Sequence, residues 1–125
     1  MVVECPLCNV EHDRILLESE HFRAIFDEYP VSPGHTLVIT KAHKYEDYNH
    51  LPLDLKRELV EFTDVVIDYL SYEYKPNGWN VGCNCGKAAG QSINHFHLHI
   101  IPRYNGDVEN PRGGVRGVIP NKQNY

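Results

Sequence analysis

Three histidines alternate with apolar residues at positions 95–101 (His-Phe-His-Leu-His-Ile-Ile), and this pattern constrains the fold more than any other part of the chain. Alternation with a period of two is typical of a β-strand, in which side chains two positions apart share one face. A strand over residues 93–101 places the three imidazoles on one surface and Phe96, Leu98 and Ile100 in the core. Each buried ring nitrogen needs a hydrogen-bond partner, so this surface indicates a functional site rather than packing alone.

Short apolar runs and one long helical pattern make up the rest of the chain. The predicted strands lie at residues 14–18, 21–27, 36–40, 79–85 and 93–101. Apolar residues recur at helical spacing over residues 52–74, and Pro76-Asn77-Gly78 ends that pattern. These elements predict one α+β domain over residues 1–125, a mostly antiparallel sheet of about five strands with one main helix packed on it.

Composition excludes several classes of protein. Twelve Lys and Arg against seventeen Asp and Glu give a net charge of −5, which argues against binding to nucleic acid polymers or to membranes through a basic surface. No run approaches the roughly 18 apolar residues that span a bilayer. The first residues, Met-Val-Val-Glu-Cys-Pro, lack the basic segment and apolar run of a secretory signal. We therefore expect a cytoplasmic protein that is not attached to a membrane.

Two kinds of chemistry fit three histidines on one strand face. They can hold zinc with a water in the open position, or one imidazole can act as a nucleophile toward phosphorus. A small-residue loop, residues 86–90 (Gly-Lys-Ala-Ala-Gly), comes directly before Gln91 and Ser92 and then the histidines. Such a loop lets backbone N–H groups approach an anion closely. The combination favours a phosphate-binding site.

Cys5-x-x-Cys8 has the spacing that lets two thiolates reach one tetrahedral metal ion. Two further ligands are needed, and His12 and His50 are candidates by position. Cys83 and Cys85 could complete an all-cysteine site. We favour them as small core residues, because reduced cysteine is commonly buried.

Residues 90–103 (Gly-Gln-Ser-Ile-Asn-His-Phe-His-Leu-His-Ile-Ile-Pro-Arg) resemble the signature of the histidine triad (HIT) family of nucleotide-binding proteins. Further matches are Asp27, residues 33–38 (Pro-Gly-His-Thr-Leu-Val), Lys41-Ala42-His43 and Asn84. The resemblance covers roughly residues 5–104. It implies a HIT-like fold and a homodimer.

The resemblance also implies a nucleotidyl transfer mechanism. His97 would attack the α-phosphorus and carry a transient nucleotidyl group, with its other ring nitrogen held by a backbone carbonyl. His99 would donate to the phosphate or to the bridging oxygen. Gln91 and Ser92 would position phosphate oxygens and the leaving group, and Asn84 would support their loop.

Nucleoside-binding positions carry over from the family in the same way. Asp27 would bind the ribose hydroxyls, and Ile25 and Phe26 would lie near the base. His35 would be a partner of the triad; the alternative is a turn histidine bonded only to backbone.

Members of the family that resemble this chain in having an N-terminal Cys-x-x-Cys complete a zinc site with two histidines. Carried over, the ligands are Cys5, Cys8, His43 and His95. A structural Zn²⁺ would then tie residues 1–12 to the histidine strand.

Transferase and phosphorylase branches of the family commonly carry Gln at the third histidine, whereas hydrolase branches carry His. His99 therefore favours a hydrolase of dinucleoside polyphosphates such as diadenosine tetraphosphate. The alternatives are a nucleoside phosphoramidase, a diadenosine tetraphosphate phosphorylase, and a nucleotide-binding sensor with little turnover.

The C-terminal tail, residues 104–125, is rich in Gly, Pro and Arg. Arg112 and Arg116 could clamp the distal phosphates of a long polyphosphate. Equally, the tail could be a surface arm that packs on the partner subunit of the homodimer.

Overall fold

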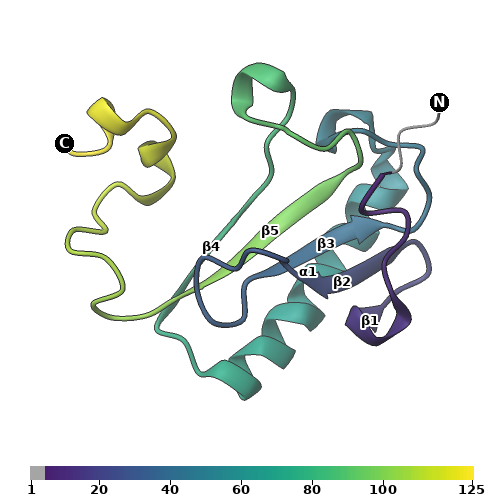
Figure 1. Cartoon of the computed structure of the whole chain (residues 1–125), viewed down its shortest axis with the longest axis horizontal. Coiled ribbons are helices and arrows are strands. Elements are labelled where there is room, and N and C mark those ends of the chain that lie inside the picture. The colour runs from purple at the N-terminus through teal and green to yellow at the C-terminus, as the bar shows by residue number, and fades with distance from the viewer. Residues whose placement is uncertain (1–4) are drawn as a thin grey trace.

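Five antiparallel strands form one sheet in the order β1-β2-β3-β5-β4, and the long helix α1 packs on one of its faces (Figure 1). The computed structural model describes residues 5–125. The strands are β1 (Ile15–Glu18), β2 (Phe22–Phe26), β3 (Thr36–Thr40), β4 (Gly78–Gly82) and β5 (His97–Arg103), and α1 spans Leu53–Tyr74. The predicted α+β architecture with one main helix is confirmed. Within residues 5–125, no helix combines the length and apolar character needed to cross a bilayer.

Alternation along the strands divides the side chains between two faces of the sheet. One face packs on α1 and forms the main core. Its buried strand residues are Phe22, Ala24, Val38, Leu98 and Ile100, and its buried helix residues are Leu55, Leu59, Phe62, Val66 and Leu70. We call this the helix face. The apolar positions of α1 recur at three- and four-residue spacing, which explains why one side of the helix is buried.

The opposite face carries His97 and His99, and we call it the triad face. The register pairs Ile39 with His97 and Leu37 with His99. Leu37 and Ile39 are buried there with Ile25 and with Leu7 of the N-terminal segment. The N-terminal segment therefore covers the β2–β3 half of the triad face.

The structure corrects the predicted ends of two strands. β4 ends at Gly82 instead of residue 85, and β5 begins at His97 instead of residue 93. Gly86 and Gly90 both have a φ of +91°, and a short 3-10 turn lies between them, so the chain cannot stay extended. The N–H of Phe96 donates to the carbonyl of Tyr45 at 2.8 Å, so the residues just before β5 pair with a loop instead of a strand.

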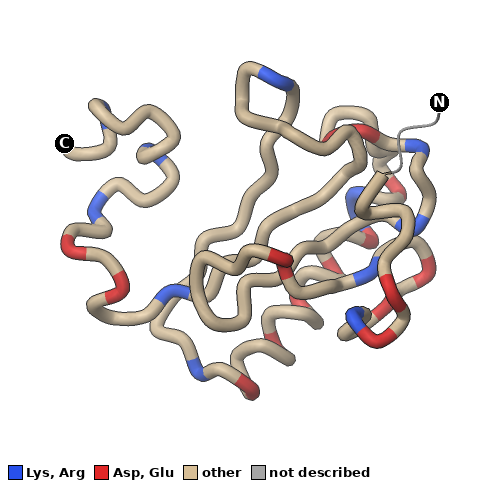
Figure 2. Tube along the Cα trace, viewed as in Figure 1, with Lys and Arg blue, Asp and Glu red and all other residues tan. Residues whose placement is uncertain are grey.

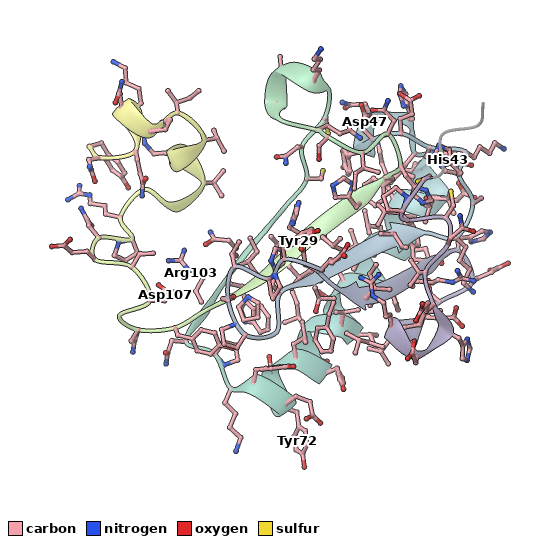
Figure 3. The ribbon with its side chains drawn as sticks, viewed as in Figure 1. Tyr29, His43, Asp47, Tyr72, Arg103 and Asp107 are labelled. Atoms are coloured by element: carbon pink, nitrogen blue, oxygen red, sulfur yellow. The ribbon has the colours of Figure 1, made fainter. Side chains whose placement is uncertain are left out.

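The C-terminal tail leaves β5 at Arg103 and lies beside the β4 edge of the sheet (Figure 1). Its regular structure consists of two short 3-10 helices, Gly114–Val118 and Pro120–Lys122. Arg103 Nε and Nη2 donate to the Asp107 carboxylate at 2.8 and 2.9 Å, and the two side chains lie together where the tail begins (Figure 3). These hydrogen bonds hold the pKa of Asp107 well below its ordinary value.

Gly34 shapes the loop that brings His35 to the triad face. Its φ is +88°, and an added Cβ would lie 3.0 Å from Cδ2 of the Tyr74 ring and 3.2 Å from Cγ of Pro102. Both the backbone conformation and the space around it therefore favour glycine. This explains why Pro33-Gly34-His35 carries a glycine at its centre.

Gly34→Ala is expected to lower the free energy of unfolding by about 1–3 kcal/mol, because the left-handed backbone and the crowded Tyr74 ring both oppose a methyl group. The measurement is chemical denaturation of the variant and the wild type. Gly82→Ala is the matched control, since an added Cβ there meets no atom within 4 Å. Equal losses of stability in the two variants would contradict the role assigned to Gly34.

Candidate functional site

Two cysteines and two histidines from three separate segments meet at the end of the sheet. They are Cys5 and Cys8 of the N-terminal segment, His43 after β3, and His95 before β5. Their ligand atoms all lie within 4.8 Å of one another. Neither His12 nor His50 belongs to this group, and the group forms without Cys83 and Cys85.

His95 orients one nitrogen into this cluster. The ring is fully buried, and its Nε2 lies 2.8 Å from the carbonyl oxygen of Thr40, to which it donates. The proton is therefore on Nε2, and the lone pair of Nδ1 faces the cysteines. Burial also lowers the pKa of His95, so the neutral ring with this free nitrogen prevails at pH 7.

The spacing of the four groups fits a tetrahedral ion. His95 Nδ1 lies 3.6 Å from Cys5 Sγ, 3.5 Å from Cys8 Sγ and 3.2 Å from His43 Nδ1. Bonds of about 2.0 Å to nitrogen and 2.3 Å to sulfur put the ligands of a tetrahedral zinc about 3.3–3.8 Å apart. The Cys8 Sγ to His43 Nδ1 distance of 2.9 Å is shorter. The four side chains therefore lie close enough to bind a metal, and two sulfurs with two nitrogens are donors typical of structural zinc.

The structure separates His95 from the other two triad histidines, contrary to the prediction of three imidazoles on one strand face. His95 lies before β5, and its ring turns toward the cysteines. His97 and His99 remain on the triad face of β5, with ring centroids 5.4 Å apart. The early start of the predicted strand caused the error, because alternation holds only within the strand.

His97 has one ring nitrogen engaged. Its Nδ1 lies 2.9 Å from the carbonyl oxygen of His95, which can only accept, so Nδ1 carries the proton. The lone pair is then on Nε2. The His97 side chain is nearly buried, with 8% of its surface exposed. This is the arrangement that a nucleophilic imidazole needs, and it agrees with the carbonyl partner that the family resemblance implies.

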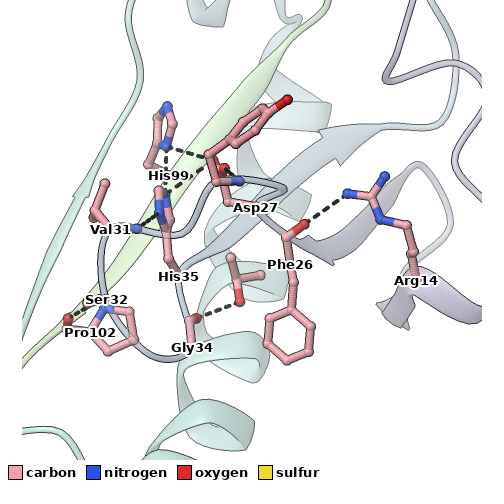
Figure 4. Close-up of polar contacts among 11 residues, drawn as sticks. Arg14, Phe26, Asp27, Val31, Ser32, Gly34, His35, His99 and Pro102 are labelled. Carbon is pink, nitrogen blue, oxygen red and sulfur yellow. Dashed lines mark hydrogen bonds and ion pairs between the residues drawn. The ribbon is translucent and has the colours of Figure 1, made fainter.

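A chain of hydrogen bonds fixes the proton of His99 (Figure 4). The N–H of Val31 donates to His35 Nδ1 at 3.1 Å, so the proton of a neutral His35 is on Nε2. His35 Nε2 lies 2.9 Å from His99 Nδ1 and donates to it. The proton of a neutral His99 is therefore on Nε2, where it can be donated to a ligand. His35 is thus both bonded to the turn backbone and a partner of the triad.

Asp27 faces the same pair of histidines. Its Oδ1 accepts the N–H of Tyr29 at 2.7 Å, and its Oδ2 lies 3.5 Å from His35 Nε2 (Figure 4). Burial lowers the pKa values of His35 and His99, and the carboxylate of Asp27 partly opposes this. Both histidines are therefore neutral at pH 7, as the hydrogen-bond chain requires.

Gln91 braces the loop before β5. Its Oε1 accepts the N–H of Gly86 at 2.9 Å, and its Nε2 donates to the carbonyls of Glu46 and Ile93 at 2.6 and 3.0 Å. The amide is therefore fully bonded within the protein and positions its neighbours. Ser92 is exposed, and its hydroxyl makes no hydrogen bond with the described residues. Of Gln91 and Ser92, Ser92 is therefore the residue whose side chain is free to bind a ligand.

The structure does not bring the two residues predicted near the base into one pocket. Ile25 is fully buried on the triad face, in the cluster with Leu37 and Ile39. Phe26 points to the helix face, and its ring meets Tyr74 edge-on at 6.2 Å. Neighbouring residues on one strand point to opposite faces, so only one of the two can line a pocket on the triad face.

Arg112 and Arg116 are held within the tail. Their guanidinium carbons lie 4.6 and 4.8 Å from the centre of the Tyr125 ring, at cation–π distance. Arg116 Nη2 also donates to the carbonyl of Lys122 at 2.8 Å. Figure 2 shows the basic positions of the tail beside the sheet. The structure therefore does not bring these arginines to His97 and His99.

Cys83 and Cys85 form a pair of their own after β4. Their sulfur atoms lie 3.8 Å apart, and both residues are half-buried. Cys83 packs against the main core, and burial raises its pKa to about 11. Its placement agrees with the prediction of a small core residue.

A profile of the HIT domain matches residues 9–106, so the chain belongs to the HIT domain family. An uncharacterised HIT-like protein of Methanocaldococcus jannaschii is 37% identical over 110 residues, which cover 87% of this chain and 84% of that protein. The AP-4-A phosphorylase of Mycobacterium tuberculosis is 33% identical over 108 residues, covering 84% and 54%. The bis(5'-adenosyl)-triphosphatase of Saccharomyces cerevisiae is 27% identical over 92 residues, covering 74% and 45%.

Solved structures agree with the family assignment. A hypothetical histidine triad nucleotide-binding protein of Sulfolobus tokodaii superposes with a TM-score of 0.70 at 42% identity, covering 74% of this chain and 62% of that one. A Zn-bound histidine triad family protein of Mycobacterium smegmatis has a TM-score of 0.68 at 33% identity, covering 77% and 69%. The predicted HIT-like fold is thus confirmed.

Asp27→Asn is expected to lower the pKa values of His35 and His99 further, because it removes the carboxylate that favours their protonated forms. NMR titration of the two rings measures this, and the coupled pair is followed as a unit. Asp47→Asn is the matched control, since Asp47 Oδ1 also accepts the N–H two residues on, at 2.8 Å, but lies in another loop. An unchanged or raised pKa in Asp27→Asn would show that the carboxylate does not act on the pair.

Proposed function

We propose that the protein is a nucleotidyl hydrolase that cleaves dinucleoside polyphosphates, such as diadenosine tetraphosphate, at the α-phosphate. The observation that carries the proposal is the hydrogen bond from His97 Nδ1 to the His95 carbonyl, 2.9 Å long, which leaves a lone pair on Nε2 beside a donor on His99. The AP-4-A phosphorylase of M. tuberculosis and the triphosphatase of S. cerevisiae, both similar to this chain, are named for substrates of this class.

In the proposed reaction, His97 Nε2 attacks the α-phosphorus. The bond from phosphorus to the bridging oxygen breaks, and the departing nucleoside polyphosphate takes the bonding electrons. His99 Nε2–H donates a hydrogen bond to that oxygen as its charge develops. The His95 carbonyl stabilises the cationic ring of His97 through Nδ1–H.

Water then attacks the phosphorus of the nucleotidyl group. The bond from His97 Nε2 to phosphorus breaks, a nucleoside monophosphate and a proton are released, and the neutral ring returns. Ser92 and the N–H groups of the preceding loop, residues 86–90, position the phosphate oxygens. Gln91 holds that loop, and Asn84 flanks it. Asp27 would bind the ribose of the transferred nucleoside; Ile25 is fully buried beside it and Phe26 lies on the other face, so neither offers the base an open surface on the triad face.

Zinc has a structural role in this proposal. Cys5, Cys8, His43 and His95 would hold it, and it would supply no step of the reaction. Because His95 would be a ligand through Nδ1 while its carbonyl bonds His97, the ion would fix the position of the nucleophile. The Zn-bound relative from M. smegmatis supports this assignment. The protein would act as a cytoplasmic homodimer.

A phosphorylase is the second candidate, because a relative at 33% identity carries that name. It uses inorganic phosphate in place of water in the second step. A histidine at the third triad position favours water, as the comparison of family branches implies. Phosphoramidase activity and slow-turnover nucleotide binding are further outcomes that the same experiment separates.

His97→Ala is expected to lower kcat by about a thousandfold or more, and His99→Ala by about a hundredfold, since the first removes the nucleophile and the second one donor. Products of diadenosine tetraphosphate are separated by chromatography, with and without inorganic phosphate, beside an adenosine phosphoramidate. ATP and AMP without added phosphate are expected. His12→Ala is the control, because His12 lies outside both clusters.

Other products would overturn the hydrolase assignment. ADP that appears only with phosphate identifies a phosphorylase, and cleavage of the phosphoramidate alone identifies a phosphoramidase. AMP binding without any cleavage identifies a sensor. Full activity in His97→Ala would reject the nucleophile.

Purified protein is expected to contain about one zinc per chain, and Cys5→Ser is expected to release it because a tetrahedral site loses a thiolate. Elemental analysis of the two proteins measures this. Cys83→Ser is the matched control and should keep its zinc. A wild-type protein that is fully folded and active without metal would contradict the structural role.

A further inference from the structure

A cavity of about 580 Å³ lies between the β4–β5 end of the triad face and the C-terminal tail. His99, Asn84 and Ile101 line it on the side of the sheet, and Val115 and Val118 line it on the side of the tail. Its volume is within the range of roughly 300–1,000 Å³ that is usual for small-molecule sites. It is large enough for a nucleoside.

The position of the cavity indicates which of the two nucleosides of a dinucleoside polyphosphate lies nearest to it. His99 is paired with Leu37 of β3 on one side and with Gly82 of β4 on the other. The cavity extends from His99 along β4, and Val31 and His35 of the loop between β2 and β3 also line it. His97 does not line it. In the proposed reaction His99 serves the bridging oxygen, which leaves with the departing group, so the cavity lies on the departing side.

The lining of the cavity selects the chemistry of its occupant. Apart from histidine, no charged residue type is among its lining residues within the described chain. A polyphosphate needs cations for stable binding, and burial of an unpaired charge is costly. The nearest arginines in sequence, Arg112 and Arg116, stack on Tyr125 and do not line the cavity. The occupant is therefore an uncharged organic group.

The tail forms one side of the cavity and is held together by its own hydrogen bonds. Among the described residues, every hydrogen bond of residues 110–125 has its partner within the same segment. Val115 and Val118 are 66% and 73% exposed, so their apolar surface is available to a ligand. The side chain of Asn84 makes no hydrogen bond with the described residues, and it offers both a donor and an acceptor.

We propose that this cavity binds the departing nucleoside of a dinucleoside polyphosphate, a role that rests on the proposed function. The base packs between Ile101 and the two valines of the tail, and Asn84 bonds its polar edge or the ribose. The tail then contributes apolar contacts to the nucleoside in place of positive charge to the phosphates. The substrate class follows from this: molecules with a nucleoside at both ends are preferred over mononucleotides with the same phosphate chain.

The test compares diadenosine tetraphosphate with adenosine 5'-tetraphosphate, which has the same phosphate chain and lacks the second nucleoside. In the double variant Val115→Asp/Val118→Asp, the ratio of the two kcat/KM values is expected to fall by about tenfold, the size of effect that lost base packing produces. The fall should lie in KM. Ile119→Asp is the matched control, since Ile119 is on the same segment, 58% exposed, and outside the cavity.

The outcomes separate this proposal from the proposed function. If the wild type cleaves both substrates and the double variant keeps the wild-type ratio, the hydrolase stands and the nucleoside subsite is rejected. If the wild type cleaves neither, the hydrolase is rejected, and calorimetric binding of the two compounds to His97→Ala decides the subsite. In His97→Ala, diadenosine tetraphosphate should bind more tightly than adenosine 5'-tetraphosphate, and adding Val115→Asp/Val118→Asp should remove that difference. Equal affinity of His97→Ala for the two compounds overturns the proposal.

Discussion

One buried histidine connects the two clusters of the site. His95 donates from Nε2 to the carbonyl of Thr40, directs Nδ1 at two cysteines and His43, and offers its own carbonyl to His97. A shift of this single residue would therefore change both the cluster of two cysteines and two histidines and the tautomer of His97. No side chain within β5 has to contact the cysteine cluster and also fix the tautomer of His97. His95 lies before the strand, and its ring faces Cys5 and Cys8 while its carbonyl accepts from His97.

Much of the fold could be predicted from the sequence, since strand alternation and helical spacing are local properties. The strand ends were less predictable. β5 starts at His97 because Gly86 and Gly90 adopt positive φ and Phe96 bonds to the backbone of Tyr45, a contact about fifty residues away along the chain. No local pattern carries that information. The cluster of Cys5, Cys8, His43 and His95 is also only partly predictable. The Cys5-x-x-Cys8 spacing indicates a metal-binding pair, but spacing alone leaves His12 and His50 as alternative ligands, and only the family resemblance implies His43 and His95.

The arginines of the tail make contacts that residue type alone does not predict. Two arginines among glycines suggest a phosphate clamp, yet both stack on Tyr125. The turns that bring them there depend on Gly113, whose φ is +92° and which has no room for a side chain beside the carbonyl of Gln123. Such a turn, closed by residues ten positions apart, cannot be inferred from composition. Val115 and Val118 had no sequence signal, because isolated apolar residues in a tail are ordinary.

The triad face is divided between the two ends of the chain. The N-terminal segment covers its β2–β3 half through Leu7, and the C-terminal tail faces its β4–β5 half across the cavity. His97 and His99 lie on β5, the strand of the second half that pairs with β3 of the first. The two histidines are therefore fixed by the sheet, whereas the surfaces on either side belong to segments that can change without altering the sheet. Under the proposed function, such an arrangement would let the same phosphorus chemistry serve different substrates, with the residues of the two ends selecting which molecule reaches the histidines.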